Sequence, residues 1–222
     1  MQANSLGDGL GMGEALSVDL ELCDRATRQV AAAELPTKWG EFRTLGFERT
    51  IKGRLETAIA LIMGDISMGA PLVRIHSQCL TGDVFGSLRC DCGEQLNSAM
   101  KAIAEEGSGI LIYEKQEGRG IGLIAKLQAY ELQDGGLDTV EANQHLGLAV
   151  DCRDFVLPVE ILKQLGVEQV RLLTNNPQKI AAVTNAGIEV VERLACEVPP
   201  SPQALFYLTT KKLKMGHVLT MV

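Results

Sequence analysis

The chain has 222 residues, of which 46% are hydrophobic and 22% are charged, and its formal net charge is −7. This length suits one large domain or two small ones, and the composition is that of a globular protein, which excludes a disordered chain, a collagen and a coiled coil. The acidic balance argues against a general nucleic-acid binder, which needs a basic surface, but it allows a local cationic site for one small anion.

The two ends of the chain differ in composition from its middle. Residues 1–33 open with a glycine-rich stretch and are expected to form a flexible N-terminal arm, without the basic segment or apolar run of a signal peptide. Residues 34–195 are predicted to form a single domain, because no linker or repeat interrupts them. In the C-terminal tail, 196–222, three prolines precede a short helix expected over 205–214. No apolar run approaches the length of a membrane span, so we expect a cytoplasmic protein without a membrane partner.

Short apolar runs alternate with helical patterns inside the predicted domain. Buried strands are expected over 72–76, 109–114, 170–173 and 188–193. Helices are expected over 95–106, 121–132, 158–165 and 177–185, from apolar spacing and from capping residues. The last strand, helix and strand form a βαβ unit, which favours a right-handed crossover and parallel pairing. The predicted fold is therefore α/β: a single three-layer domain with a mixed, partly parallel sheet flanked by helices.

Three of the six cysteines lie close together in the stretch CLTGDVFGSLRCDC, namely Cys79, Cys90 and Cys92. The spacing of Cys90 and Cys92 puts both thiols on one side of an extended segment, because side chains alternate there. Two glycines between Cys79 and Cys90 allow the chain to turn back. Three thiolates could then converge on one soft metal ion, for which Zn²⁺ is the best match.

A three-cysteine site leaves the role of the metal open. A catalytic zinc needs a fourth position held by water, whose pKa the metal lowers towards about 7. A structural zinc would need a fourth protein ligand, and the thiols could also simply be buried without metal. The candidates for a fourth ligand are Cys23, Cys152, Cys196 and His76.

Two turns between a strand and a helix could hold an anionic nucleotide. In the first, over 117–122, glycines let backbone N–H groups approach an anion at a helix N-terminus. In the second, Asn176 is a good N-cap and Pro177 a good first helical residue. Lys179 then lies in the first turn, against the preference of the helix dipole. A bound anion would explain this lysine, and so would exposure to solvent.

Asp151 and Arg153 stand two residues apart in the stretch DCRDF and could form an acid–base pair or an ion pair, with Asp154 as a helix cap. Further arginines flank the cysteine stretch and the first glycine turn. Together, the thiols and the arginines indicate a zinc-dependent reaction on a phosphorylated substrate; these arginines are Arg74, Arg89, Arg119 and Arg153.

The sequence resembles the GTP cyclohydrolase II family in several stretches that follow one another in order. They are LPTKWGEF (35–42), RIHSQCLTGDVFGSLRCDCGEQL (74–96), QEGRGIGL (116–123), LQDGGLDTVEAN (132–143), DCRDF (151–155), LG (165–166) and RLLTNNPQK (171–179). The resemblance implies hydrolytic opening of the guanine imidazole ring of GTP at the start of riboflavin biosynthesis. Formate and pyrophosphate would be released, leaving 2,5-diamino-6-(5-phosphoribosylamino)pyrimidin-4-one. It also implies Zn²⁺ and Mg²⁺ as cofactors and a homodimer.

The resemblance also implies roles for individual residues. The three clustered cysteines would ligate the zinc, whose water would attack C8 and then the formyl group. Arg153 would be the nucleophile at the α-phosphate, Asp151 the proton acceptor, and Tyr130 would serve the formate-releasing step. Because guanidinium stays protonated to high pH, electrostatic stabilisation of the leaving pyrophosphate is an alternative role for Arg153. The implied nucleotide contacts are Arg74, Ile75, His76, Ser77, Gln78, Gln95, Glu117, Gly118, Arg119, Thr139, Thr174 and Lys179.

Three positions depart from the family pattern. Gln78 stands where the family usually has glutamate, Gly120 where asparagine is common, and Cys152 where a charged or polar residue is expected. Gln78 removes a carboxylate beside the metal site, which favours a non-enzymatic GTP-binding relative as an alternative. A relative whose product keeps the formyl group and a structural zinc domain are two further alternatives. The tail, with Tyr207, Lys211 and His217, is similar to the usual ending of the family.

Overall fold

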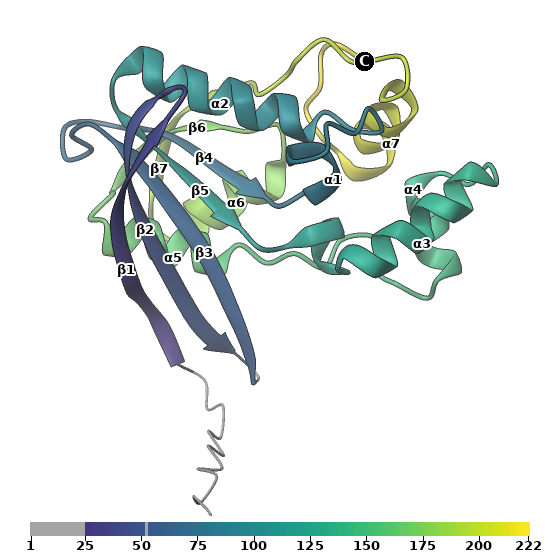
Figure 1. Cartoon of the computed structure of the whole chain (residues 1–222), viewed down its shortest axis with the longest axis horizontal. Helices are drawn as coiled ribbons and strands as arrows, with labels where there is room; N and C mark the ends of the chain where they lie inside the picture. The colour runs from purple at the N-terminus through teal and green to yellow at the C-terminus, as the bar shows by residue number, and fades with distance from the viewer. Residues whose placement is uncertain (1–24, 52) are drawn as a thin grey trace, which may run out of the picture.

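The fold is built on one mixed sheet, seen in a computed structural model that describes residues 25–51 and 53–222 (Figure 1). Its strands are β1 (Arg25–Thr37), β2 (Gly40–Ile51), β3 (Arg54–Met63), β4 (Leu72–Ser77), β5 (Gly109–Glu114), β6 (Gln169–Leu173) and β7 (Glu189–Leu194). They lie in the order β1-β2-β3-β5-β4-β6-β7. Pairing is antiparallel from β1 to β5 along this order and parallel from β5 to β7. The predicted mixed, partly parallel sheet is confirmed.

Helices cover both faces of this sheet and complete the three layers. They are α1 (Leu80–Asp83), α2 (Cys92–Glu106), α3 (Leu123–Asp134), α4 (Thr139–His145), α5 (Val156–Gln164), α6 (Pro177–Asn185) and α7 (Leu205–Met215), with a 3₁₀ turn at Glu117–Gly120. On one face, Ile103 of α2 packs with Phe42 and Leu111 of the sheet. On the other face, Ile161 of α5 and Val183 of α6 fill the larger core cluster. Because helices cover both sides, β4 and β5 are buried on both faces; β5 carries the apolar run 110–112, whereas β4 also buries Arg74 and His76.

The remaining helices gather beyond one end of the sheet. α3, α4 and α7 lie past the carboxyl ends of β4 and β5, on the side where α1 also lies (Figure 1). α4 contacts both α3 and α7. Among the described residues, no helix combines the length and the apolarity that crossing a membrane would require.

The predicted elements are found, and two regions differ from expectation. β5 and α6 have the predicted bounds, and the other predicted elements differ only by a few residues at their ends. Residues 25–33, which we expected in a flexible arm, instead form most of β1 and pair with β2. Residues 1–24 of that arm lie outside the described residues. The β1–β3 meander had no sequence-based assignment, because most of β1 is exposed and carries no apolar stripe.

Packing of α2 on the sheet should determine stability, since this helix begins at Cys92 and carries part of the candidate metal site. Ile103 is fully buried, so Ile103→Ala should lower the free energy of unfolding by about 2–5 kcal/mol. Urea denaturation measures this loss. Lys101→Ala, on the exposed side of the same helix, is the control and should change stability by less than about 0.5 kcal/mol. Equal losses in both variants would contradict this packing.

Candidate active site

A pocket opens where the parallel strands β4, β5 and β6 end, the edge at which ligands bind in open α/β sheets. Every predicted site residue except Ile75 and Asp151 lines it. The side chain of Ile75 lies in the core, and Asp151 contacts Arg153 from outside the lining. The predicted residues in the lining are Arg74, His76, Ser77, Gln78, Cys79, Cys90, Cys92, Gln95, Glu117, Gly118, Arg119, Tyr130, Thr139, Arg153, Thr174 and Lys179.

The three clustered cysteines are placed to share one metal ion. The sulfurs of Cys79, Cys90 and Cys92 all lie within 4.8 Å of one another, and those of Cys79 and Cys90 are 3.6 Å apart. Tetrahedral zinc with Zn–S bonds of about 2.3 Å needs sulfurs about 3.8 Å apart. The donor set and its spacing therefore fit Zn²⁺.

The candidates for a fourth ligand lie outside this cluster in the part of the chain that the structure describes. Cys152 and Cys196 are free and are not in the group of convergent ligands. His76 is occupied by Asp83, at 3.0 Å from its Nε2 atom. Cys23 lies outside the described residues. Among the described residues, only Cys79, Cys90 and Cys92 therefore converge on this site, and none supplies a fourth ligand.

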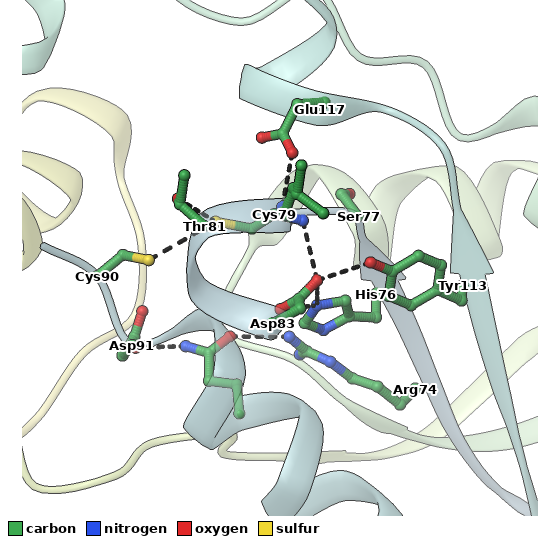
Figure 2. A network of polar contacts seen from close by, with 12 residues as sticks. Arg74, His76, Ser77, Cys79, Thr81, Asp83, Cys90, Asp91, Tyr113 and Glu117 are labelled. Atoms are coloured by element: carbon green, nitrogen blue, oxygen red, sulfur yellow. Dashed lines mark hydrogen bonds and ion pairs between the residues drawn. The ribbon is translucent and has the colours of Figure 1, made fainter. Parts of the chain in front are cut away.

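Asp83 organises the loop that carries Cys79 (Figure 2). One of its oxygens accepts hydrogen bonds from the backbone N–H of Cys79 at 2.9 Å and from the hydroxyl of Tyr113 at 2.8 Å. The other binds Nε2 of His76, whose ring stacks on Tyr113 with centroids 5.4 Å apart. Burial lowers the pKa of His76, so its ring is neutral and donates through Nε2. Sequence reasoning did not single out Asp83, although it lies in the conspicuous turn after Cys79.

Glu117 and Lys126 form a second support beside the thiols. Glu117 accepts hydrogen bonds from the backbone N–H of Leu80 at 2.6 Å and from Nζ of Lys126 at 2.8 Å. Lys126 also donates to the sulfur of Cys79 at 3.2 Å. The carboxylate of Glu117, predicted as a nucleotide contact, is therefore engaged within the protein. Lys126 was missed because nothing in the local pattern of α3 distinguishes it from a surface lysine.

The glycine turn after β5 presents a half-buried arginine, Arg119, whose buried Nη atoms have no hydrogen-bond partner among the described residues. Arg119 has φ of 61°, and among the described residues it is the one non-glycine with positive φ. Such backbone costs about 1–3 kcal/mol and persists at functional sites. Both Nη atoms of Arg119 are buried without a hydrogen bond from the described residues, and the guanidinium lies 5.5 Å from the ring centre of Tyr207. A buried charge normally has a partner, so this geometry fits an anionic ligand.

Asp151 and Arg153 form an ion pair, one of the two arrangements that their spacing allowed. Nε of Arg153 donates to Asp151 at 2.9 Å and Nη2 donates to the other oxygen at 2.5 Å. Burial opposes both charges, yet the pairing outweighs it, lowering the pKa of Asp151 and raising that of Arg153. Asp151 is consequently a weak base, and Arg153 stays a cation.

Lys179 is buried, so its exposure to solvent is excluded. Asn176 caps α6 as predicted, accepting from the N–H of Gln178, and Nζ of Lys179 donates to the carbonyl of Ile75 at 2.8 Å. Burial, together with the charges of Arg74 and Arg153, holds the pKa of Lys179 well below its usual range. The predicted contact Ile75 therefore enters the site through its carbonyl.

Four further predicted contacts, Arg74, Gln95, Thr174 and Thr139, form part of the pocket wall. Arg74 donates to Oε1 of Gln95 at 2.8 Å, and the amide of Gln95 donates to Asp91, between two zinc-ligand candidates. Thr174 accepts from the N–H of Asn176 at 3.1 Å. Thr139 is the first residue of α4, whose cap, Asp138, makes a reciprocal capping box. These residues orient one another before any ligand enters.

The C-terminal tail adds residues that were not among the predicted site. Tyr207, Lys211 and His217 line the pocket, and Nζ of Lys211 lies 4.4 Å from the ring centre of Tyr207. Burial, with the charges of Lys211, Arg153 and Arg119, lowers the pKa of His217 to about 3. Their similarity to the family's usual ending was the signal that could have identified them.

Gly82 should be required for metal binding, because it packs against the sulfurs. A Cβ atom at Gly82 would lie 2.9 Å from the sulfur of Cys90 and 3.2 Å from that of Cys79. Gly82→Ala should therefore cost about 1–3 kcal/mol of overpacking, which weakens zinc binding roughly tenfold or more. Zinc competition with a chromophoric chelator measures the loss. Gly135→Ala, at an exposed glycine with φ of −79°, is the control and should bind zinc like the wild type. Unchanged zinc affinity in Gly82→Ala would contradict the close packing of Gly82 against the cysteine sulfurs.

Comparisons with known proteins identify the family of this chain. The profile of the family described as GTP cyclohydrolase II matches residues 27–195. A protein named GTP cyclohydrolase-2 from Enterobacter sp. (strain 638) is 55% identical to this chain, and the match covers 87% of this chain and 98% of that protein. A protein of the same name from Klebsiella pneumoniae subsp. pneumoniae is 56% identical, and the match covers 86% of this chain and 96% of that protein. Among solved structures, a two-domain 3,4-dihydroxy-2-butanone 4-phosphate synthase from A. baumannii matches with 20% identity and a TM-score of 0.44. The match covers 76% of this chain and 40% of that protein, and it is too distant to support a conclusion. The chain belongs to the GTP cyclohydrolase II family.

Proposed function

We propose that this hydrolase opens the imidazole ring of the guanine of GTP in riboflavin biosynthesis. Formate and pyrophosphate leave, and 2,5-diamino-6-(5-phosphoribosylamino)pyrimidin-4-one is the product. The observation that carries this proposal is a pocket that combines a three-thiol cluster with an arginine, Arg119, whose buried Nη atoms have no hydrogen-bond partner among the described residues. Family membership and the names of the relatives support the same reaction.

Cys79, Cys90 and Cys92 would hold the zinc ion. With three thiolates and an open position, zinc supplies Lewis acidity that makes a water nucleophilic near neutral pH, as attack on C8 requires. Cys92 begins α2, where the helix dipole favours its thiolate. Asp83 holds the backbone of Cys79 in place, so the ligands are pre-organised.

The triphosphate would lie against the cations of the pocket. The Nη groups of Arg119 have no hydrogen-bond partner among the described residues, and both Arg119 and Lys211 contact the Tyr207 ring. Charge-assisted hydrogen bonds from arginine suit phosphate oxygens well. Mg²⁺ would come with the triphosphate, because proteins usually hold it through few side chains together with phosphates. Arg74 to Gln78, Gln95, Glu117, Gly118, Thr139, Thr174 and Lys179 remain proposed nucleotide contacts.

We favour an electrostatic role for Arg153. Its guanidinium is a cation paired with Asp151, which makes it a poor nucleophile and a good partner for the leaving pyrophosphate. Asp151, a weak base in this pair, would orient Arg153, while the role of proton acceptor remains the alternative.

Tyr130 would act in its protonated form. Burial raises its pKa to about 12, and its hydroxyl lies 3.3 Å from that of Thr81 beside the thiol cluster. A phenol that keeps its proton can donate a hydrogen bond to an oxygen of the formyl group. This role fits the formate-releasing step.

Gln78 favours a second candidate, a relative that retains the formyl group or binds GTP without turnover. Gln78 lines the pocket, and the carboxylate of Glu114, at the end of the neighbouring strand β5, accepts hydrogen bonds from the hydroxyl of Ser77 at 2.6 Å and from Gln116 at 2.9 Å. No free carboxylate from Glu114 replaces the usual glutamate. Homodimer formation, a cytoplasmic location and the absence of a nucleic-acid partner remain predictions.

Product analysis separates these functions. Purified zinc-loaded protein incubated with GTP and Mg²⁺ should release formate and pyrophosphate in equal amounts, measured by formate dehydrogenase and pyrophosphatase assays. Pyrophosphate without formate would indicate the formyl-retaining relative, and GTP binding without either product would indicate the non-enzymatic one. In those cases, Gln78→Glu should restore the missing step if Gln78 is the cause.

Arg153→Ala should slow pyrophosphate release by roughly 100-fold or more, the effect of removing one transition-state donor. Zinc content should stay at the wild-type level, because Arg153 does not contact the thiols. Arg153→Lys keeps a charge but loses the two-pronged contact with Asp151, so its rate should be intermediate. Arg171→Ala, in the middle of β6, removes an arginine that pairs with Glu106 outside the pocket; it is the matched control and should react at nearly the wild-type rate. A near wild-type rate in Arg153→Ala would refute its assignment.

A further inference from the structure

Lys126 extends from α3 to the thiol cluster and is almost completely buried, with 8% of its surface exposed. Its ammonium group has three acceptors: the sulfur of Cys79 at 3.2 Å, the hydroxyl of Thr81 at 2.9 Å and the carboxylate of Glu117 at 2.8 Å. An ammonium group has three N–H donors, so this set uses all of them. The side chain is thus fixed in one orientation, with one proton directed at a zinc-ligand candidate.

The charge of this ammonium matters for a metal held by three thiolates. A zinc ion with three thiolates has a net charge of −1, which weakens its pull on electrons of a further ligand. One ammonium that donates to a thiolate brings the charge of ion, sulfurs and lysine to zero. A hydrogen bond to sulfur also withdraws electron density from the metal–sulfur bond, as groups behind metal ligands do generally.

We propose that Lys126 tunes the metal centre, its ammonium hydrogen bond to Cys79 raising the Lewis acidity of an ion held by the three cysteines. Lys126 is a positioning residue here, because it acts through the sulfur of Cys79. The inference rests on the metal centre of the proposed function. The pairing of Lys126 with the Glu117 carboxylate at 2.8 Å is the ion pair expected of a lysine cation.

The alternative is that Lys126 only neutralises Glu117. That carboxylate already accepts hydrogen bonds from the N–H groups of Leu80 and Gly118, at 2.6 and 2.9 Å, so its two oxygens have partners without the lysine. A purely structural lysine would have no need to approach sulfur. The two roles differ in one observable, the electronic state of the Cys79 thiolate.

Cobalt substitution reads out that electronic state without any turnover. The full-length protein loaded with Co²⁺ should show a sulfur-to-cobalt charge-transfer band. In Lys126→Met, the thiolate loses a hydrogen bond, its electrons are held less tightly, and the band should move to lower energy. Zinc affinity, from chelator competition, should fall by roughly 10–100-fold. Lys126→Arg keeps the charge and a donor, and its band should return most of the way to the wild-type position.

Controls separate the hydrogen bond from general charge and from folding. Lys211→Met removes another pocket cation, one that pairs with Asp91 and makes no hydrogen bond to the three sulfurs, and should move the band less than Lys126→Met does. If Lys126→Met does not fold, because Glu117 is left buried with its charge, the double variant Lys126→Met/Glu117→Gln is compared with Glu117→Gln alone. An unmoved band in Lys126→Met, or an equal shift in Lys211→Met, would overturn the inference and leave the proposed reaction intact. A wild-type protein that takes up no Co²⁺ or Zn²⁺ would overturn the metal centre itself.

Discussion

The parallel pairing of β4 with β5 and β6 is the constraint on which the pocket depends. His76 and Ser77 of β4 stand beside Tyr113 and Glu114 of β5 in register. This register lets Asp83 reach both His76 and Tyr113, and so fixes the backbone at Cys79. Because side chains alternate along a strand, a slip of one residue would turn these groups to the opposite face. The loop that carries Cys79 would then lose the hydrogen bonds that hold its backbone.

Burying charged side chains is the main energetic cost of forming this pocket. Ion pairs between acidic and basic side chains offset part of that cost. Asp151 holds Arg153, and Glu117 holds Lys126, each through short hydrogen bonds. Arg119 differs, because no described residue provides a partner for its Nη groups. An uncompensated buried charge is costly unless a ligand completes it. The net charge of −7 is therefore compatible with an anionic substrate, because the pocket has its own local balance.

Local patterns in the sequence predicted local features well. The cap at Asn176 and Pro177 defined α6, and the spacing of the cysteines indicated a shared metal. Contacts between distant residues were not predictable in the same way. Lys126 meets Cys79 across 47 positions, and nothing in α3 signals that contact. Lys179 was ambiguous for the same reason, since its burial depends on the carbonyl of a strand far away along the chain. The edge strand β1 lacked the apolar stripe from which strands are recognised.

Two departures from the family pattern, Gly120 and Cys152, are one feature in the folded protein. Gly120 has φ of 87°, and a Cβ atom there would lie 3.1 Å from both the backbone and the Cβ of Cys152. The N–H of Cys152 donates to the carbonyl of Arg119, so the two segments are joined at this point. Glycine at position 120 adopts the left-handed backbone without strain, and because it has no Cβ atom it also allows Cys152 to approach closely. Neither residue lines the main pocket, whereas their neighbours Arg119 and Arg153 do. The pair therefore sets how closely the two arginine-bearing segments approach each other, and changing one position calls for a change at the other.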